Sequence, residues 1–219
     1  MAREIAPRAW AAIEDLLGGE ERVEQAGSGA VWDSVLAGNF GSAYERTQGS
    51  WQPPTARDEY TGVPLGGWHK DGGHFRHFLD SPEQGLLTIV FWSDVHPRCG
   101  GTFAALDSVG VVSRFLAQHP EGIHADSVQG SGYLIPPLIS ECTGMVELTG
   151  EAGDVCLMHP FVLHRISGNP SGRARFISNP AVRLREPMDL NREDPNQFSA
   201  VESAILRGLG VPGFASARA

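Results

Sequence analysis

The stretch "GLLTIVFW", residues 85–92, carries the strongest fold signal in the 219-residue chain. It is a continuous apolar run with a glycine before it and the polar pair "SD" after it. Periodicity alone cannot separate such a run from a buried helix, but its short length and its Thr-Ile-Val content favour a strand. We therefore expect residues 85–92 to form the central strand of a buried sheet.

Segments of the same kind recur along the chain, separated by glycine, proline and aspartate. Their lengths and spacing are typical of an antiparallel sandwich or barrel. We predict strands in "GTFAAL" (101–106), "GMVEL" (144–148), "GDVCLMH" (153–159), "FVLHRI" (161–166) and "RARFISNPAVRL" (173–184), with "AVWDSVLAGNF" (30–40) as a further candidate.

Three amphipathic helices are predicted around these strands, because apolar residues there recur at helical spacing between start and stop signals. They begin at Pro7, Ser108 and Ser199 and end before Gly18, Pro120 and Gly210. Ser199 and Glu202 have the spacing of a capping box. The elements together predict a mainly β fold, a double-stranded β-helix of the jelly-roll or cupin type with peripheral α-helices, in one domain over residues 1–219.

Composition excludes several classes of function. A formal net charge of −9 argues against nucleic acid as a partner, because phosphate binding needs a surplus of Lys and Arg. No apolar window is long enough to cross a membrane, and charges interrupt the first apolar residues, so we expect neither a membrane span nor a signal peptide. The three cysteines have no CxxC spacing. We expect a cytoplasmic protein with a small-molecule partner; the sequence leaves the oligomeric state open.

Two His-x-Asp triplets could supply metal ligands, because residues two apart on an extended segment point the same way. His69-Lys70-Asp71 precedes the strand at 85–92 and leaves room for a sheet to fold back before the next histidines. His124-Ala125-Asp126 follows a predicted helix end and a "PEG" turn. We interpret this second triplet as a surface loop.

A third ligand must come from a distant strand, and the candidates are His159 and His164 in "GDVCLMHPFVLHRISGN". His159 precedes a strand-breaking proline, whereas His164 continues an apolar segment. Two histidines and one carboxylate around a metal with open positions match the facial triad of non-haem Fe(II) oxygenases. Further on, Arg173 and Arg175 are expected on the same face of a strand, where a buried arginine would require a carboxylate partner.

The motifs taken in order resemble the phytanoyl-CoA dioxygenase family of Fe(II)/2-oxoglutarate-dependent oxygenases. The likeness covers about residues 60–185 and consists of His69-x-Asp71, "VFWSDVHPRCGGT", "GDVCLMHPFVLH", Asn169 and Arg175. The resemblance implies a jelly-roll core, Fe(II), 2-oxoglutarate and O2 as cofactors, and formation of succinate and CO2. The presence of the carboxylate implies hydroxylation or a related oxidation, since related halogenases lack it.

The resemblance also implies a role for each motif residue. His69, Asp71 and His164 would ligate Fe(II), so that His164 rather than His159 is the second histidine ligand. Arg175 would pair with the distal carboxylate of 2-oxoglutarate, and Trp92 and Thr102 would line the co-substrate, although Trp92 could instead be a core tryptophan.

The family often has a small polar residue two positions after the last histidine. Ile166 stands there in this chain and Ser167 follows it, so the hydroxyl that assists Arg175 is left open.

Basic residues near the candidate metal site suggest an anionic substrate. Lys70 is expected to point outward, and His74, Arg76 and His77 to form a positive cluster; Arg165 and Arg173 could serve the same purpose. A solvated rim is the other interpretation of this cluster. Two other classes of function remain open: a cupin-like metalloenzyme that does not use 2-oxoglutarate, and a non-catalytic jelly-roll binding module.

Overall fold

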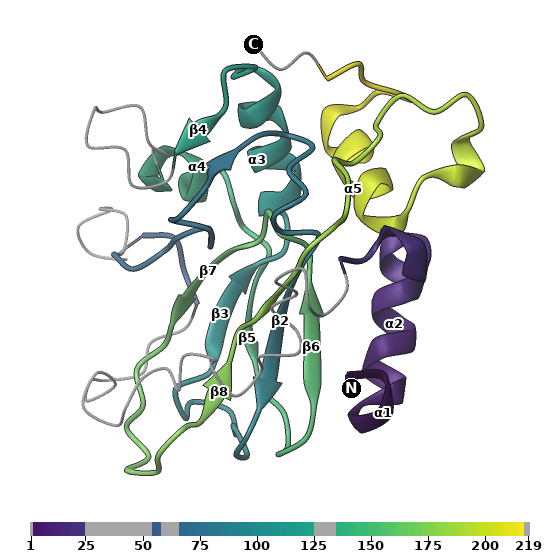
Figure 1. The fold of residues 1–219 in the computed structure, drawn as a ribbon. Coiled ribbons are helices and arrows are strands. Elements are labelled where there is room, and N and C mark those ends of the chain that lie inside the picture. Colours follow the sequence, from purple (N-terminus) through teal and green to yellow (C-terminus); the bar gives the residue numbers. More distant parts are fainter. Residues whose placement is uncertain (1, 25–53, 58–65, 125–134, 217–219) are drawn as a thin grey trace.

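The computed structural model describes residues 2–24, 54–57, 66–124 and 135–216. Within these ranges the chain forms antiparallel sheets with helices around them (Figure 1). The predicted strand at 30–40 lies outside the described residues, and so does Asp126 of the second His-x-Asp triplet. The mainly β prediction is confirmed at this level.

Two antiparallel sheets form the centre of the fold. One has the order β6 (Val155–Met158), β2 (Leu86–Phe91) and β8 (Ile177–Ser178), and β9 (Ala181–Val182) also pairs with β2. The other has the order β5 (Met145–Leu148), β3 (Thr102–Ala105) and β7 (Leu163–Ile166). A separate two-stranded ladder joins β1 (Arg76–His77) to β4 (Ile123–His124).

β2 is the central strand, as its sequence predicts, and all six of its residues are buried. Ile89 and Phe91 belong to a cluster with Ala104 of β3, which fills the space between the two sheets. Val90, on the opposite face of the strand, belongs to a second cluster that includes Ile13 of helix α2. A strand buried on both faces has no polar alternation, which explains its continuous apolar run.

The helices cover the sheets and close one end of the fold (Figure 1). They are α1 (Ala2–Ile5), α2 (Pro7–Leu17), α3 (Ser108–Ala117), α4 (Ile135–Ser140) and α5 (Ala200–Leu209), with 3₁₀ turns at Glu20–Arg22 and Pro195–Gln197. α2, α3 and α5 were predicted, and Ser199 and Glu202 form the expected capping box at the start of α5. α3 and α5 cross where Gly110 and Gly208 face one another.

The prediction of one strand over residues 173–184 is wrong. Only β8 and β9 are strands, and Pro180 lies between them. Residues 173–176 are irregular, so the alternation expected for a strand does not hold there. Arg173 is exposed while Arg175 is 3 % exposed, and the two side chains do not share a face.

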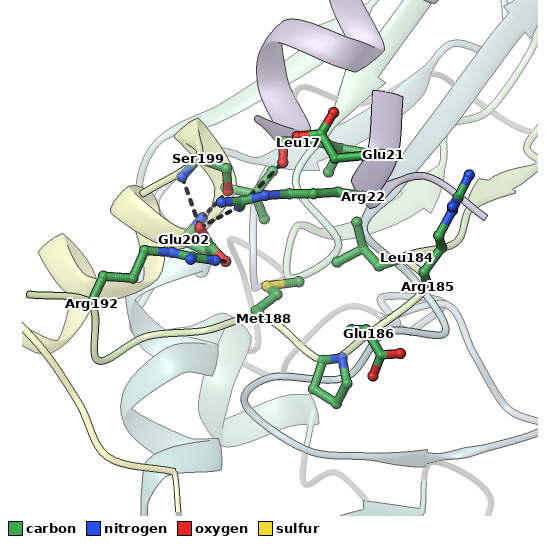
Figure 2. Close-up of a pocket in the computed structure, with 12 residues that line it drawn as sticks. Leu17, Glu21, Arg22, Leu184, Arg185, Glu186, Met188, Arg192, Ser199 and Glu202 are labelled. Carbon is green, nitrogen blue, oxygen red and sulfur yellow. Dashed lines mark hydrogen bonds and ion pairs between the residues drawn. The ribbon is translucent and has the colours of Figure 1, made fainter. Parts of the chain in front are cut away.

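Glu202 connects α5 to the 3₁₀ turn at Glu20–Arg22 through a hydrogen bond with Arg22. Its carboxylate accepts hydrogen bonds from Arg22, Arg192 and the main-chain N–H groups of Ser199 and Asp189. Figure 2 shows the two guanidinium groups meeting at this carboxylate, beside a cavity of about 210 Å³. The three arginines that line this cavity, Arg22, Arg185 and Arg192, are hydrogen-bonded to protein oxygen atoms.

Across the described residues, no helix combines the length and apolar character needed to span a bilayer. All three cysteines, Cys99, Cys142 and Cys156, are free thiols.

Candidate metal site

The backbone brings His69 and His164 together. The two residues form an isolated antiparallel bridge, in which His69 N–H donates to His164 O at 2.9 Å and His164 N–H donates to His69 O at 3.0 Å. Residues paired in this way project their side chains to the same side. The imidazole centroids consequently lie 4.3 Å apart, with the ring planes inclined by 55°.

Local hydrogen bonds orient both rings in the same manner. His69 Nδ1 lies 2.8 Å from Gly67 O, and His164 Nδ1 lies 3.0 Å from Val162 O. With a proton on each Nδ1 bonded to its carbonyl, Nε2 is the nitrogen that faces Asp71. It donates to the carboxylate when it carries a proton, and it offers a lone pair to a metal when the ring is neutral. Such a backbone partner is typical of histidines that bind metals.

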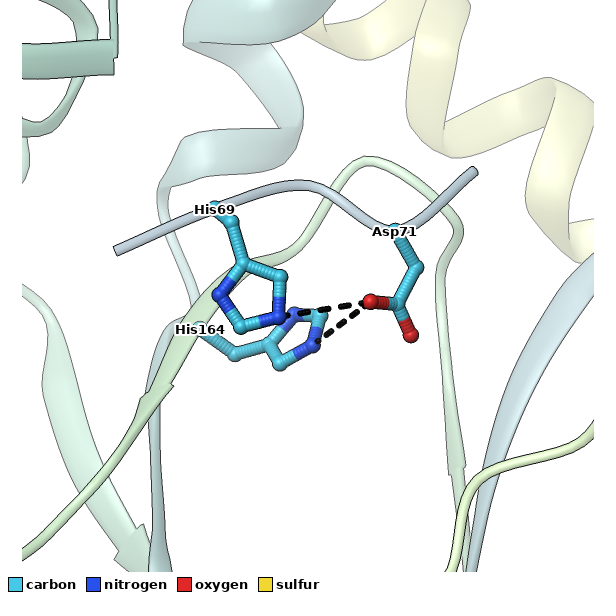
Figure 3. A group of neighbouring side chains, drawn as sticks. All are labelled: His69, Asp71 and His164. Carbon is cyan, nitrogen blue, oxygen red and sulfur yellow. Dashed lines mark ion pairs between the residues drawn. The ribbon is translucent and has the colours of Figure 1, made fainter. Parts of the chain in front are cut away.

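Asp71 completes the group. Its Oδ1 atom lies 3.3 Å from Nε2 of His69 and 3.5 Å from Nε2 of His164, and Figure 3 shows both rings directed at this one oxygen. The next residue, Gly72, has φ +107°, and a Cβ atom there would lie 2.5 Å from the His77 ring. The turn that aims Asp71 back at the histidines therefore requires glycine.

The ligand atoms of His69, Asp71 and His164 lie within 4.8 Å of one another, and no other group of this kind occurs in the part of the chain that the structure describes. Two imidazole nitrogens and one carboxylate oxygen suit a divalent transition metal, and three ligands leave coordination positions open. The side chain of His69 is 48 % exposed and that of His164 is 7 % exposed. The site is therefore open toward solvent on the His69 side.

The three groups stabilise one another electrostatically. Burial raises the pKa of Asp71, but hydrogen bonds from the rings of His164 and His69 outweigh it and hold this pKa well below its ordinary value. The hydrogen bond to this carboxylate in turn raises the pKa of His69 and outweighs the partial desolvation of its ring. Asp71 is thus an anion at neutral pH, as a metal ligand must be.

Arg175 and Thr102 are brought together next to this group. Arg175 Nη1 donates to Thr102 Oγ1 at 3.3 Å, and Thr102 is one of the residues of β3 that pair with β7. In this register Ala104 pairs with His164 and Thr102 pairs with Ile166. Thr102 and Ala104 are two residues apart on β3 and face the same side. Thr102 is therefore displaced along the strand by about 7 Å from the position that pairs with His164. Burial lowers the pKa of Arg175 to about 10, so it remains a cation at neutral pH.

Lys70 does not point outward, contrary to the sequence prediction. It is the only lysine of the chain and is 6 % exposed. Its ammonium donates to Gln84 Oε1 at 3.1 Å and to Asp71 O at 3.2 Å, and it lies 5.7 Å from the centroids of the Phe75 and Phe161 rings. Burial lowers the pKa of Lys70 to about 7. This side chain supports the loop from within and does not line the open side of the site.

The predicted positive cluster does not form. His77 is fully buried, its Nε2 lies 2.8 Å from Gly72 O, and burial lowers its pKa to about 3, so it is neutral. His74 and Arg76 are exposed, and the Arg76 guanidinium donates to the carbonyls of Glu121 and Gly122. Arg165 projects from the face of β7 opposite His164, toward the rings of Trp68 and Phe103.

Trp92 is brought neither to the candidate co-substrate position nor to the core. It is 42 % exposed, and its indole N–H donates to Ser178 Oγ at 3.0 Å. Ser178 pairs with Val90, whose side chain is on the face of β2 away from the space between the sheets. Trp92 therefore lies on the outer face, whereas Thr102 and Arg175 lie inside.

The remaining motif residues have structural contacts. His159 accepts from Phe161 N–H through Nδ1, and its Nε2 lies 3.3 Å from Val201 O, away from the metal group. Asn169 donates to Arg173 O and closes the turn before Arg175. Ser167 donates toward Glu147 and Gly168. The hydroxyl that contacts Arg175 is that of Thr102.

Asn179 is a site residue that the sequence interpretation missed. Its Nδ2 donates to Asp71 Oδ2 at 3.0 Å. Asn179 lies two residues after Ile177, which belongs to the cluster between the sheets. Counting alternate residues from Ile177 would have placed Asn179 on the inner face.

The chain matches no family model, and no curated protein matches it.

Proposed function

We propose that this protein is a non-haem Fe(II)- and 2-oxoglutarate-dependent oxygenase that hydroxylates a small molecule. The observation that carries the proposal is the convergence of His69, Asp71 and His164. The buried Arg175 contacts Thr102, which lies two residues along β3 from the partner of His164. Two facing antiparallel sheets with outer helices are compatible with the double-stranded β-helix that such oxygenases use. The sequence resemblance to the phytanoyl-CoA dioxygenase family supports the same function.

The candidate residues have complementary tasks in this proposal. His69, Asp71 and His164 would hold Fe(II), and Arg175, oriented by Thr102, would bind the distal carboxylate of 2-oxoglutarate. The separation of about 7 Å between the level of His164 and that of Thr102 is comparable to the length of a five-carbon dicarboxylate. A buried guanidinium gains more from an anionic partner than an exposed one does, because burial weakens its hydration.

The chemistry that Fe(II) supplies when bound is the reaction of O2 with 2-oxoglutarate and substrate, which gives succinate, CO2 and the hydroxylated product. The protein's own residues orient the reactants and exclude water. The open side at His69 is where a substrate would approach.

An anaerobic titration with Fe(II) and 2-oxoglutarate tests the proposal. We expect a metal-to-ligand charge-transfer band in the visible spectrum of the wild type. His164→Ala should abolish the band, while His74→Ala, which changes an exposed histidine close to the site, should retain it. A folded wild-type protein without the band would rule out this function.

Arg175 provides a matched test of the co-substrate. Arg175→Ala should raise the 2-oxoglutarate concentration for half-maximal absorbance by about thirtyfold or more, since loss of one partner of a buried charge pair costs about 2 kcal/mol or more. Arg173→Ala, which removes an exposed arginine two residues earlier, should change it by less than about twofold. Metal binding without any effect of Arg175→Ala would instead favour a cupin-like metalloenzyme.

A further inference from the structure

The two oxygens of Asp71 have different partners. Oδ1 faces the Nε2 atoms of His69 and His164, whereas Oδ2 accepts a hydrogen bond of 3.0 Å from the side-chain amide of Asn179. A fixed donor on Oδ2 restrains rotation of the carboxylate and keeps Oδ1 as the oxygen directed between the two imidazoles.

The backbone holds Asn179 in a fixed position. It lies between β8 and β9, which both pair with β2. Thr88 donates twice to the next carbonyl, Pro180 O, from its N–H at 3.0 Å and its hydroxyl at 2.7 Å. Trp92 N–H binds Phe176 O at the other end of this segment. Asn179 thus comes from a rigid strand region and not from a free loop.

The hydrogen bond also joins the two sheets. Asp71 follows His69, whose backbone is paired with His164 at β7, while Asn179 belongs to the sheet built on β2. The Asn179–Asp71 contact therefore spans the space between the layers at the level of the metal group. An amide is suited to this task because it orients the carboxylate without cancelling its charge, as an arginine or lysine would.

We propose that Asn179 is a positioning residue that holds Asp71 as a monodentate ligand through Oδ1. The inference rests on the metal site of the proposed function, and it adds that the coordination positions for co-substrate and O2 stay open because Oδ2 is occupied. Without Asn179 the carboxylate can rotate and bind through both oxygens.

Binding of Co(II) alone tests this role, since Co(II) replaces Fe(II) in such ligand sets and has visible absorption that depends on coordination number. Asn179→Leu removes the donor at similar volume. Loss of an outer hydrogen bond to a metal ligand should weaken Co(II) binding by about tenfold to a hundredfold. The visible spectrum of the saturated variant should also change, which a merely structural role would not produce.

Ser178→Ala is the matched control, because it removes a side-chain hydrogen bond from the adjacent residue on the opposite face. It should leave the affinity for Co(II) and the spectrum unchanged. Urea unfolding of the metal-free variants shows whether Asn179→Leu is folded, and Asn179→Ala serves as the second variant if it is not.

Wild-type affinity and spectrum in a folded Asn179 variant would overturn the inference, and so would a wild type that does not bind Co(II). If the wild type binds Co(II) but gives no 2-oxoglutarate-dependent band with Fe(II), the proposed oxygenase function fails. The comparison of Co(II) affinity still decides the role of Asn179 in that case.

Discussion

Lys70 lies between two candidate metal ligands in the sequence, yet its ammonium is directed away from them into a buried pocket. Two hydrogen bonds and two aromatic faces surround it there. A buried amine of this kind is charged at a cost in solvation, and the cost appears as its pKa of about 7.

Replacing Lys70 should change how stability depends on pH. The unfolded state holds the Lys70 proton up to about pH 10.5 and the folded state only up to about pH 7, so the unfolded state binds more protons between these values. Wild-type stability should therefore rise relative to Lys70→Met by about 1.4 kcal/mol per pH unit in this window. Urea unfolding of both proteins at pH 7, 8 and 9 measures the difference, and a constant difference would contradict a lowered pKa of Lys70 in the folded state.

The sequence predicted individual site residues where the residue types have few other structural roles. His69, Asp71 and His164 form an uncommon ligand set, and the structure brings their ligand atoms together. Arg175 is buried and donates to Thr102. Lys70 could not be predicted, because its direction depends on Gln84 and two aromatic rings that the fold supplies.

At the scale of elements, the crossing of α3 and α5 depends on two glycines. A Cβ atom on Gly208 would lie 2.7 Å from Gly110 Cα, a distance that real structures do not tolerate. A Cβ atom on Gly110 would lie 3.3 Å from the flexible Arg114 guanidinium and no closer than 3.5 Å to the backbone of Gly208. Alanine has the same advantage over glycine in helix propensity at both positions, but only Gly110 has room for the added methyl group.

We expect Gly208→Ala to lower the free energy of unfolding by about 1–3 kcal/mol, since the helices must move apart. Gly110→Ala should be neutral or stabilise by up to about 1 kcal/mol, because alanine is the better helix former. Urea unfolding of the two variants provides the measurement. Equal stability of the two would show that the helices do not pack at this distance.

Helices and strands that depend on neighbouring residues in the sequence were predictable. Strands that depend on pairing with a distant segment were not. The capping box at Ser199 and the apolar run at 85–92 each determine an element from neighbouring residues. Within the described residues, the short strands β1 and β4 pair only with each other, and neither has an apolar pattern of its own. Trp92 follows β2 and lies on the outer face, where its indole contacts Ser178 of β8. This position depends on the register between β2 and β8, which cannot be derived from the sequence.

For the whole molecule, two buried neutral histidines should make the fold sensitive to acid. Burial lowers the pKa of His77 and of His159 to about 3. Between pH 3 and pH 6.5 the unfolded state binds these protons and the folded state does not, so stability is highest above pH 6.5 and falls as the pH is lowered. Each histidine contributes about 1.4 kcal/mol per pH unit in this window.

His159→Gln should reduce this acid sensitivity, since glutamine can accept from Phe161 N–H and donate toward Val201 O without titrating. Urea unfolding of the metal-free proteins between pH 7.5 and pH 4.5 should give a shallower decline for the variant. Parallel declines would mean that His159 is not a buried neutral group.

The bridge between His69 and His164 has a consequence for the order of folding. The two residues are far apart in the sequence, and their pairing closes a long loop that includes β2, β3, β5 and β6. Contacts between residues this far apart in the sequence form after local contacts, because the entropy cost of closing the loop opposes them. A metal ion can therefore bind only a chain that is nearly folded. We expect a bound metal ion to leave the refolding rate unchanged and to slow unfolding. The ion would then increase the kinetic stability of the native state.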